Sequence, residues 1–137
     1  MASLTLRIIT PERIAFDEPV DSVSLPATGG SAGVLPRHAH MITALDPGVL
    51  SYTVGGQTQE LFVGGGFAEV QGDTVRVLSS VGERADEIDE ERARAAEKRA
   101  RERLALRSKS EDAFDALRAE LALQRALMRQ RVKRGRS

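Results

Sequence analysis

The 137-residue chain contains no Cys and no Trp, and aromatic residues make up only 4% of it. Without Cys there is no disulfide framework, no thiolate nucleophile and no Cys-ligated metal site. The 20 basic and 20 acidic side chains cancel, which argues against binding of the whole chain to nucleic acid or lipid. No secretory signal is visible in residues 1–10, and the most apolar later stretch, residues 61–68, is too short to span a membrane.

The last third of the chain also lacks helix breakers. All five Pro and all Gly except Gly135 precede residue 83. Charge divides at the same place, because residues 1–85 carry five basic and nine acidic side chains and the remainder carries 15 and 11. We therefore predict two domains of different class, residues 1–84 and 86–137, joined close to residue 85.

Residues 1–84 have the pattern of short strands. Apolar and polar side chains alternate at residues 4–8 and 74–77, which is the period of a half-buried strand. The glycine pair at 55–56 predicts a two-residue hairpin of type I′, and residues 70–74 predict a second hairpin. Without a helical pattern between the strands, this spacing favours an antiparallel β-sandwich over a parallel α/β sheet.

Residues 86–137 have the pattern of two helices. Their expected apolar stripes are Ala93, Ala96, Ala100 and Leu104 on the first helix, and Phe114, Leu117, Leu121 and Met128 on the second. Between them, Ser108 and Glu111 have the spacing of a capping box. The chain is thus predicted to be an α+β protein, with a sandwich followed by a helical hairpin. Because an alanine-rich seam buries little apolar area, we expect the hairpin to be weakly held.

Two motifs invite a chemical interpretation. His38 and His40 lie two residues apart, as two metal ligands on a strand would, but no Cys or flanking carboxylate completes the set. The glycines at 64–66 lack the spacing of a dinucleotide-binding or P-loop motif. We therefore expect packed or subunit-facing histidines, no metal site, and a glycine run that lets two backbones approach closely.

Four segments together resemble the ε subunit of F-type ATP synthases. They are RIITPER at 7–13, GVLPRHAH at 33–40, GGGFAEV at 64–70 and IDEERA at 88–93, the last of which matches the Ile/Leu-Asp-x-x-Arg-Ala motif of that family. The segments occur in the family order, and the resemblance covers essentially the whole chain. It implies the same architecture of sandwich and helical hairpin.

The resemblance implies a rotor subunit without catalytic residues or a required cofactor. Its expected partners are the γ subunit, the c-ring and the α/β catalytic hexamer. In the family, the sandwich binds γ and the ring and transmits proton-driven rotation, and the hairpin, when it extends, inhibits ATP hydrolysis. The expected location is the cytoplasmic side of the bacterial inner membrane, with membrane contact only through the complex. The residues expected to contact γ or the c-ring are Gly29, Gly30, Ser31 and His38.

A group of charges in the hairpin suggests a nucleotide site. Asp89 and Arg92 are three residues apart on one helix, and Arg125 and Arg129 are four apart on the other, so a folded hairpin can bring them together. A guanidinium group can donate two parallel hydrogen bonds to phosphate oxygens, and a carboxylate can accept a hydrogen bond from the adenine amino group. In some bacterial family members the matching residues bind ATP as a regulatory ligand. The resemblance therefore adds Ile88 and Ala93 of the motif to the residues expected to bind ATP. Intrahelical salt bridges are the alternative explanation.

A nucleic-acid-binding module is the second functional class. Six basic residues and no acid occur between residues 125 and 136, as in segments that bind phosphate backbones. Interleaved aromatic side chains are absent from this run, and the rest of the chain is acidic. The sequence therefore favours the rotor subunit, with no nucleic acid among its partners.

Overall fold

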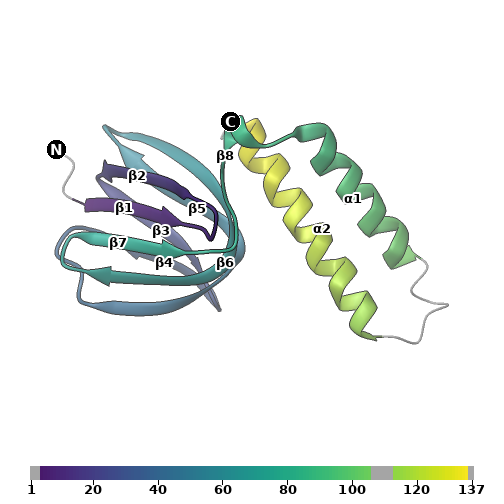
Figure 1. Ribbon diagram of the computed structural model, residues 1–137, viewed down its shortest axis with the longest axis horizontal. Helices are drawn as coiled ribbons and strands as arrows, with labels where there is room; N and C mark the ends of the chain where they lie inside the picture. The colour runs from purple at the N-terminus through teal and green to yellow at the C-terminus, as the bar shows by residue number, and fades with distance from the viewer. Residues whose placement is uncertain (1–3, 106–112, 136–137) are drawn as a thin grey trace.

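A computed structural model describes residues 4–105 and 113–135 of the chain, as a sandwich of strands followed by two helices (Figure 1). The strands are β1 (Leu4–Ile9), β2 (Ile14–Val20), β3 (Ser22–Ala27), β4 (Gly30–Val34), β5 (Met41–Val54), β6 (Gln57–Gln71), β7 (Thr74–Leu78) and β8 (Gly82–Arg84). A 3-10 turn, η1 (Ala85–Glu87), leads to the helices α1 (Glu90–Ala105) and α2 (Ala113–Arg134). The capping box expected at Ser108 and Glu111 lies outside the described residues.

The strands form one sheet that folds over on itself. Their order is β2-β1-β7-β6-β5-β3-β4, with β8 paired to β6. The long strand β6 belongs to both layers, since residues 67–71 pair with β7 whereas residues 61–63 pair with β8. Neighbouring strands are antiparallel except β1 and β7, which pair in parallel. The predicted sandwich is confirmed, with this one parallel pair added.

Glycines occupy the turns of the two predicted hairpins and the place where β6 passes from one layer of the sandwich to the other. Gly55 and Gly56 connect β5 to β6 with φ of 58° and 80°, as a type I′ turn requires. Gly72, with φ of 59°, lies in the two-residue turn between β6 and β7. Where β6 passes between the two layers, a Cβ on Gly66 would overlap the carbonyl oxygen of Leu78. The expected close approach of two backbones at residues 64–66 is therefore confirmed.

Replacing Gly66 by alanine is expected to destabilise the sandwich by about 3 kcal/mol or more, because the new Cβ meets backbone atoms at a φ of 108°. Gly72→Ala is the matched control, since Gly72 also has a positive φ but no atom within 4 Å of the added Cβ. The control should cost only about 1 kcal/mol. Denaturant unfolding of the two variants measures the difference, and equal costs would contradict the proposed overlap.

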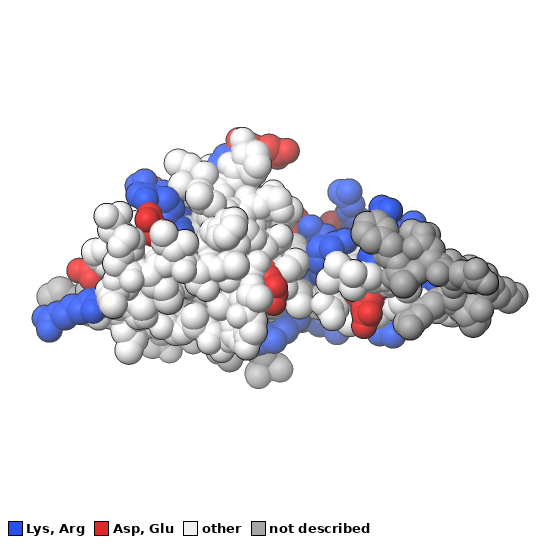
Figure 2. Space-filling model, turned by 90° about the horizontal axis from the view of Figure 1, so that it is seen from below, with Lys and Arg blue, Asp and Glu red and all other residues white. Residues whose placement is uncertain are grey.

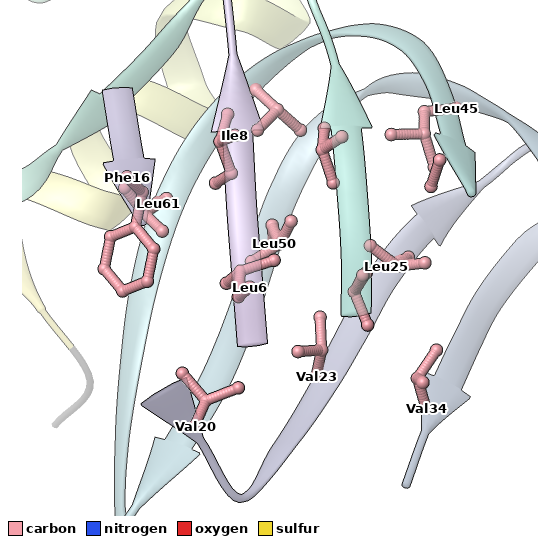
Figure 3. Close-up of a cluster of buried hydrophobic side chains, with 14 of the residues drawn as sticks. Leu6, Ile8, Phe16, Val20, Val23, Leu25, Val34, Leu45, Leu50 and Leu61 are labelled. Carbon is pink, nitrogen blue, oxygen red and sulfur yellow. The ribbon is translucent and has the colours of Figure 1, made fainter. Parts of the chain in front are cut away.

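The main core lies between the two layers of the sandwich. The alternating residues Leu4, Leu6 and Ile8 of β1 point into it and are buried, as predicted. Side chains from β2, β3, β4, β5 and β6 meet them from the other strands (Figure 3). Burial of this apolar surface is what stabilises the sandwich.

The two helices meet through alanines. The buried residues of this seam are Ala93, Ala100, Ala119 and Ala126. The stripe expected on the second helix is wrong for Leu117 and Leu121, which are 51% and 38% exposed. Its other described member, Met128, packs against the sandwich, and the side chain of Phe114 lies outside the described part. At 100° per residue, Leu117 and Leu121 lie almost opposite Ala119. Small side chains let helices approach closely, so alanines rather than leucines form the seam.

The connection between the domains is fixed to the sandwich. The Arg13 guanidinium lies 2.7 Å from a carboxylate oxygen of Glu87, and donates to the carbonyl oxygen of Gly82 at 3.1 Å. The backbone N–H of Arg84 donates to the other Glu87 oxygen at 3.0 Å. Burial raises the pKa of Glu87, but these bonds to the carboxylate outweigh it, so the pKa lies below its usual value. The 3-10 turn is thereby anchored to Arg13, just before β2, and to β8.

Candidate functional site

Among the described residues, the apolar contact between the hairpin and the sandwich is made by the segment just before α1 and by the end of α2 (Figure 1). Phe62 of β6, Ile88 and Val132 are buried there and form the junction cluster. Val49, Val81, Ala85 and Met128 pack around it. Since only three residues are fully buried, the apolar contact between the domains is small.

A pocket of about 340 Å³ opens beside this cluster. We call it the junction pocket. Its volume falls in the range of small-molecule sites. It is lined by Glu83, Glu87, Ile88, Asp89, Arg92, Ala93, Ala96, Arg99 and Arg129.

Asp89 begins α1 and faces the pocket at the same time. One of its carboxylate oxygens accepts from the backbone N–H of Arg92 at 3.1 Å, and its carbonyl oxygen accepts from the N–H of Ala93 at 3.0 Å. These bonds make Asp89 the N-cap of the helix. The helix start thus accounts for Asp89 whether or not a ligand is present. It does not account for Arg92, because any residue except Pro would supply the same backbone N–H.

The arginines of the pocket differ in how firmly they are held. Arg129 Nε donates to Glu83 at 2.8 Å, and its guanidinium lies 4.6 Å from the centre of the Phe62 ring. Arg92 is exposed and makes no side-chain hydrogen bond or ion pair within residues 4–105 and 113–135. A phosphate group could therefore reach Arg92 without breaking an existing contact.

Five of the six residues expected to bind ATP line this one pocket, namely Ile88, Asp89, Arg92, Ala93 and Arg129. Arg125 does not line it, although it lies one turn before Arg129 on α2. Arg99 lines the pocket and was missed. It lies seven residues after Arg92, which places the two on one helix face, and that spacing could have indicated it.

Polar contacts join the helices on the opposite side of the hairpin. Gln130, which is buried, donates to Glu97 at 2.8 Å, and Arg134 donates to Glu90 at 3.2 Å. The hydrogen bond from Gln130 lowers the pKa of Glu97, and the one from Arg134 lowers the pKa of Glu90. These carboxylates are therefore held in the ionised form.

A row of apolar side chains crosses the outer face of the sandwich. Phe67 and Leu78 are 59% and 49% exposed and lie opposite each other on β6 and β7. The pairing of neighbouring strands extends the row to Ala44 on one side and to Ile9 and Ile14 on the other. Ile9 is half-buried and the other four residues are exposed. Such an alignment of accessible apolar residues across five strands is typical of a protein interaction surface.

Two of the four residues expected to contact γ or the c-ring belong to β4, an edge strand, and the other two lie in the segments on either side of it. Gly29 precedes it, Gly30 and Ser31 begin it, and His38 follows it. His38 Nδ1 lies 2.7 Å from the carbonyl oxygen of Ala39, and His40 Nε2 lies 3.5 Å from Glu69. Among the described residues, no group of three His, Cys, Asp or Glu side chains could hold a metal ion.

Comparison with known proteins identifies the family. The model of the ATP synthase delta/epsilon chain β-sandwich domain matches residues 3–85, and that of the delta/epsilon chain long α-helix domain matches residues 86–134. The chain belongs to the delta/epsilon family of ATP synthase subunits. It is 51% identical over 105 residues to the ATP synthase epsilon chain of Carboxydothermus hydrogenoformans, covering 77% of this chain and 78% of that one. It is 47% identical over 131 residues to that of Nitratidesulfovibrio vulgaris, covering 96% of each.

Chains in two solved ATP synthase structures have a similar fold. A chain in the Euglena gracilis mitochondrial ATP synthase structure of OSCP, F1 and c-ring superposes with a TM-score of 0.76 at 27% identity, over 93% of this chain and 79% of that one. One in the Tetrahymena thermophila structure of central stalk and c-ring has a TM-score of 0.60 at 11% identity, which shows the shared fold. Membership makes the chain an epsilon-type component of ATP synthase.

Three of the six basic residues in the run of this epsilon-type subunit form ion pairs within the chain. Arg129, Arg131 and Arg134 each pair with a glutamate of another element. Those carboxylates occupy the charges that a phosphate backbone would need, which weighs against the nucleic-acid module. None of the described helices is both long and apolar enough to cross a membrane.

Proposed function

We propose that the protein is a non-catalytic rotor subunit of the central stalk. In this role the sandwich binds the γ subunit and the c-ring, and the helical hairpin extends toward the α/β hexamer to inhibit ATP hydrolysis. Family membership and the similarity to a chain of the Euglena complex of F1 and c-ring support it. The subunit then lies at the cytoplasmic side of the bacterial inner membrane and contacts the membrane through the complex.

The row of Ala44, Phe67, Leu78, Ile9 and Ile14 supports a role for the sandwich in binding γ. It offers a continuous apolar face, and such surfaces are buried in stable protein complexes. On the side of the sandwich seen in Figure 2, much of the surface carries no charge. The edge at β4, with Gly29, Gly30, Ser31 and His38, is then left for the ring.

The small junction cluster supports a movable hairpin. Releasing it from the sandwich exposes three buried apolar side chains and uncovers four partly buried ones, so the free-energy difference between a folded and an extended hairpin can be a few kcal/mol. A two-state equilibrium with so small a free-energy difference shifts when a ligand binds only one of the two states.

The junction pocket supports ATP as that ligand. Arg92, Arg99 and Arg129 offer guanidinium groups to phosphate oxygens, and Ile88 and Ala93 offer apolar atoms. Because residues from β8, η1, α1 and α2 form the pocket together, it exists only while the hairpin is folded. ATP bound there would stabilise the folded hairpin and relieve inhibition.

Removing residues 86–137 is expected to raise ATP hydrolysis by the assembled complex severalfold, because these residues form the helices proposed to enter the hexamer. The α2 helix alone, with 22 residues, is about 33 Å long. ATPase assays of complexes reconstituted with the full or the shortened chain measure the effect. Binding of the shortened chain to γ is the control, and unchanged hydrolysis by a complex containing it would contradict the inhibitory role.

A further inference from the structure

The end of α2 carries a run of basic residues whose function the family comparison does not explain. Within six residues, its arginines form ion pairs with glutamates of three different elements. Arg129 pairs with Glu83 of β8 at 2.8 Å, Arg131 with Glu60 of β6 at 3.0 Å, and Arg134 with Glu90 of α1 at 3.2 Å. No acidic residue occurs in this part of the helix to compete for them.

These ion pairs connect α2 both to the sandwich and to α1, the two parts from which it can separate when the hairpin opens. The pairs with Glu83 and Glu60 join α2 to the sandwich, and the pair with Glu90 joins α2 to α1. Glu90 also accepts from Arg94 of its own helix at 2.9 Å, and Gln130 connects Arg134 to Glu97. The contacts form a network on one rigid helix, so ordering one pair lowers the entropy cost of the next.

The apolar contacts at the same place are few. The junction cluster buries three side chains, and the seam between the helices is alanine. Burial of alanine contributes little free energy, so the ion pairs account for a larger share of docking than they would beside a leucine-rich core. The side chain of Glu60 is only 4% exposed, which protects its pair with Arg131 from full solvent screening.

We propose that the basic end of α2 is an electrostatic latch that holds the hairpin folded, with Arg131 and Arg134 as its two contacts outside the junction pocket. The proposal rests on the hairpin movement proposed above. Neither arginine lines the junction pocket, so the latch acts without nucleotide and can be altered without touching the candidate ATP site. It also makes the folded state sensitive to ionic strength.

The test measures the position of the hairpin in the full chain without nucleotide. The absence of Cys allows two cysteines to be introduced for spin labels, at Val54 on the sandwich and Leu117 on α2, both of which are exposed. Arg131→Glu with Arg134→Glu is expected to raise the population of opened hairpin about twofold to tenfold over the parent, from the strength typical of exposed pairs. Raising the salt concentration should open the parent chain and affect this variant less.

Lys98→Glu with Arg103→Glu on α1 is the matched control. It changes the net charge of the hairpin equally, and neither residue has an ion pair in the part of the chain that the structure describes. The control variant should keep the parent's distance distribution. Equal opening by both variants would show that overall charge, not the paired arginines, sets the position, and would overturn the latch.

Val132→Asp provides a reference for an opened hairpin, because it places a charge in the junction cluster. If this variant opens while the arginine variant keeps the parent's distances, the latch is wrong and the movement of the hairpin stands. If neither opens, both the latch and the proposed movement are wrong. Opening by the arginine variant and by Val132→Asp, with a closed control, supports the proposal.

Discussion

Replacing Phe67 or Leu78 by aspartate is expected to weaken binding of the chain to the γ subunit by about a hundredfold or more. Both side chains lie at the centre of the apolar row, and the outer residues Ala44, Ile9 and Ile14 flank them. Central apolar contacts dominate the free energy of protein interfaces, and a buried unpaired carboxylate adds its own desolvation cost. A hundredfold change in dissociation constant corresponds to about 2.8 kcal/mol. Calorimetric titration of γ with each variant measures it.

Val54→Asp is the control for these two variants. Val54 is an exposed apolar residue at the end of β5, beside the hairpin turn and outside the row. It should bind γ like the parent chain, and all three variants should keep the parent's thermal stability, because each replaced side chain is exposed. Normal binding by both Phe67→Asp and Leu78→Asp would show that γ binds another surface.

Replacing Arg92 by alanine is expected to weaken ATP binding tenfold to hundredfold. A charge-assisted hydrogen bond contributes roughly 1.5–3 kcal/mol, which corresponds to this range of dissociation constants. Arg92 is the cleanest position for the test, because its side chain has no ion pair with the described residues that the change would break. Calorimetric titration of the isolated chain with ATP, and the rise of its melting temperature with ATP, measure the effect.

Two further variants test whether ATP binds in the junction pocket or in the arrangement that the sequence spacing predicted. Arg99 lines the junction pocket, so Arg99→Ala should also weaken ATP binding. Arg125 has the predicted spacing but does not line the pocket, so Arg125→Ala should have a much smaller effect. If Arg125→Ala weakens binding as strongly as Arg92→Ala, the nucleotide binds in a different arrangement from this pocket. If titration with millimolar ATP gives no heat signal, the chain has no ATP site.

The local features of the fold could be predicted from the sequence because they depend on neighbours in the chain. Gly55 and Gly56 predict their hairpin through the positive φ that a type I′ turn needs. The alternation of residues 4–8 predicts a half-buried strand, and β1 shows that burial pattern. The motif at residues 88–93 places Asp89 at the helix start, where it caps α1. Even part of the candidate nucleotide site follows, since Asp89 and Arg92 lie on one turn.

Contacts between distant segments were decided by the tertiary structure. The leucines of α2 have the more hydrophobic pattern, yet alanines form the seam, because close approach of two helices selects small side chains at positions that only the packing defines. The apolar row needs the register of five strands, and no single segment shows it. From its charge alone, the basic run suggested binding to an external phosphate backbone only as the second functional class. The fold instead supplies Glu83, Glu60 and Glu90 as its partners, because folding brings carboxylates from three elements against one helix end.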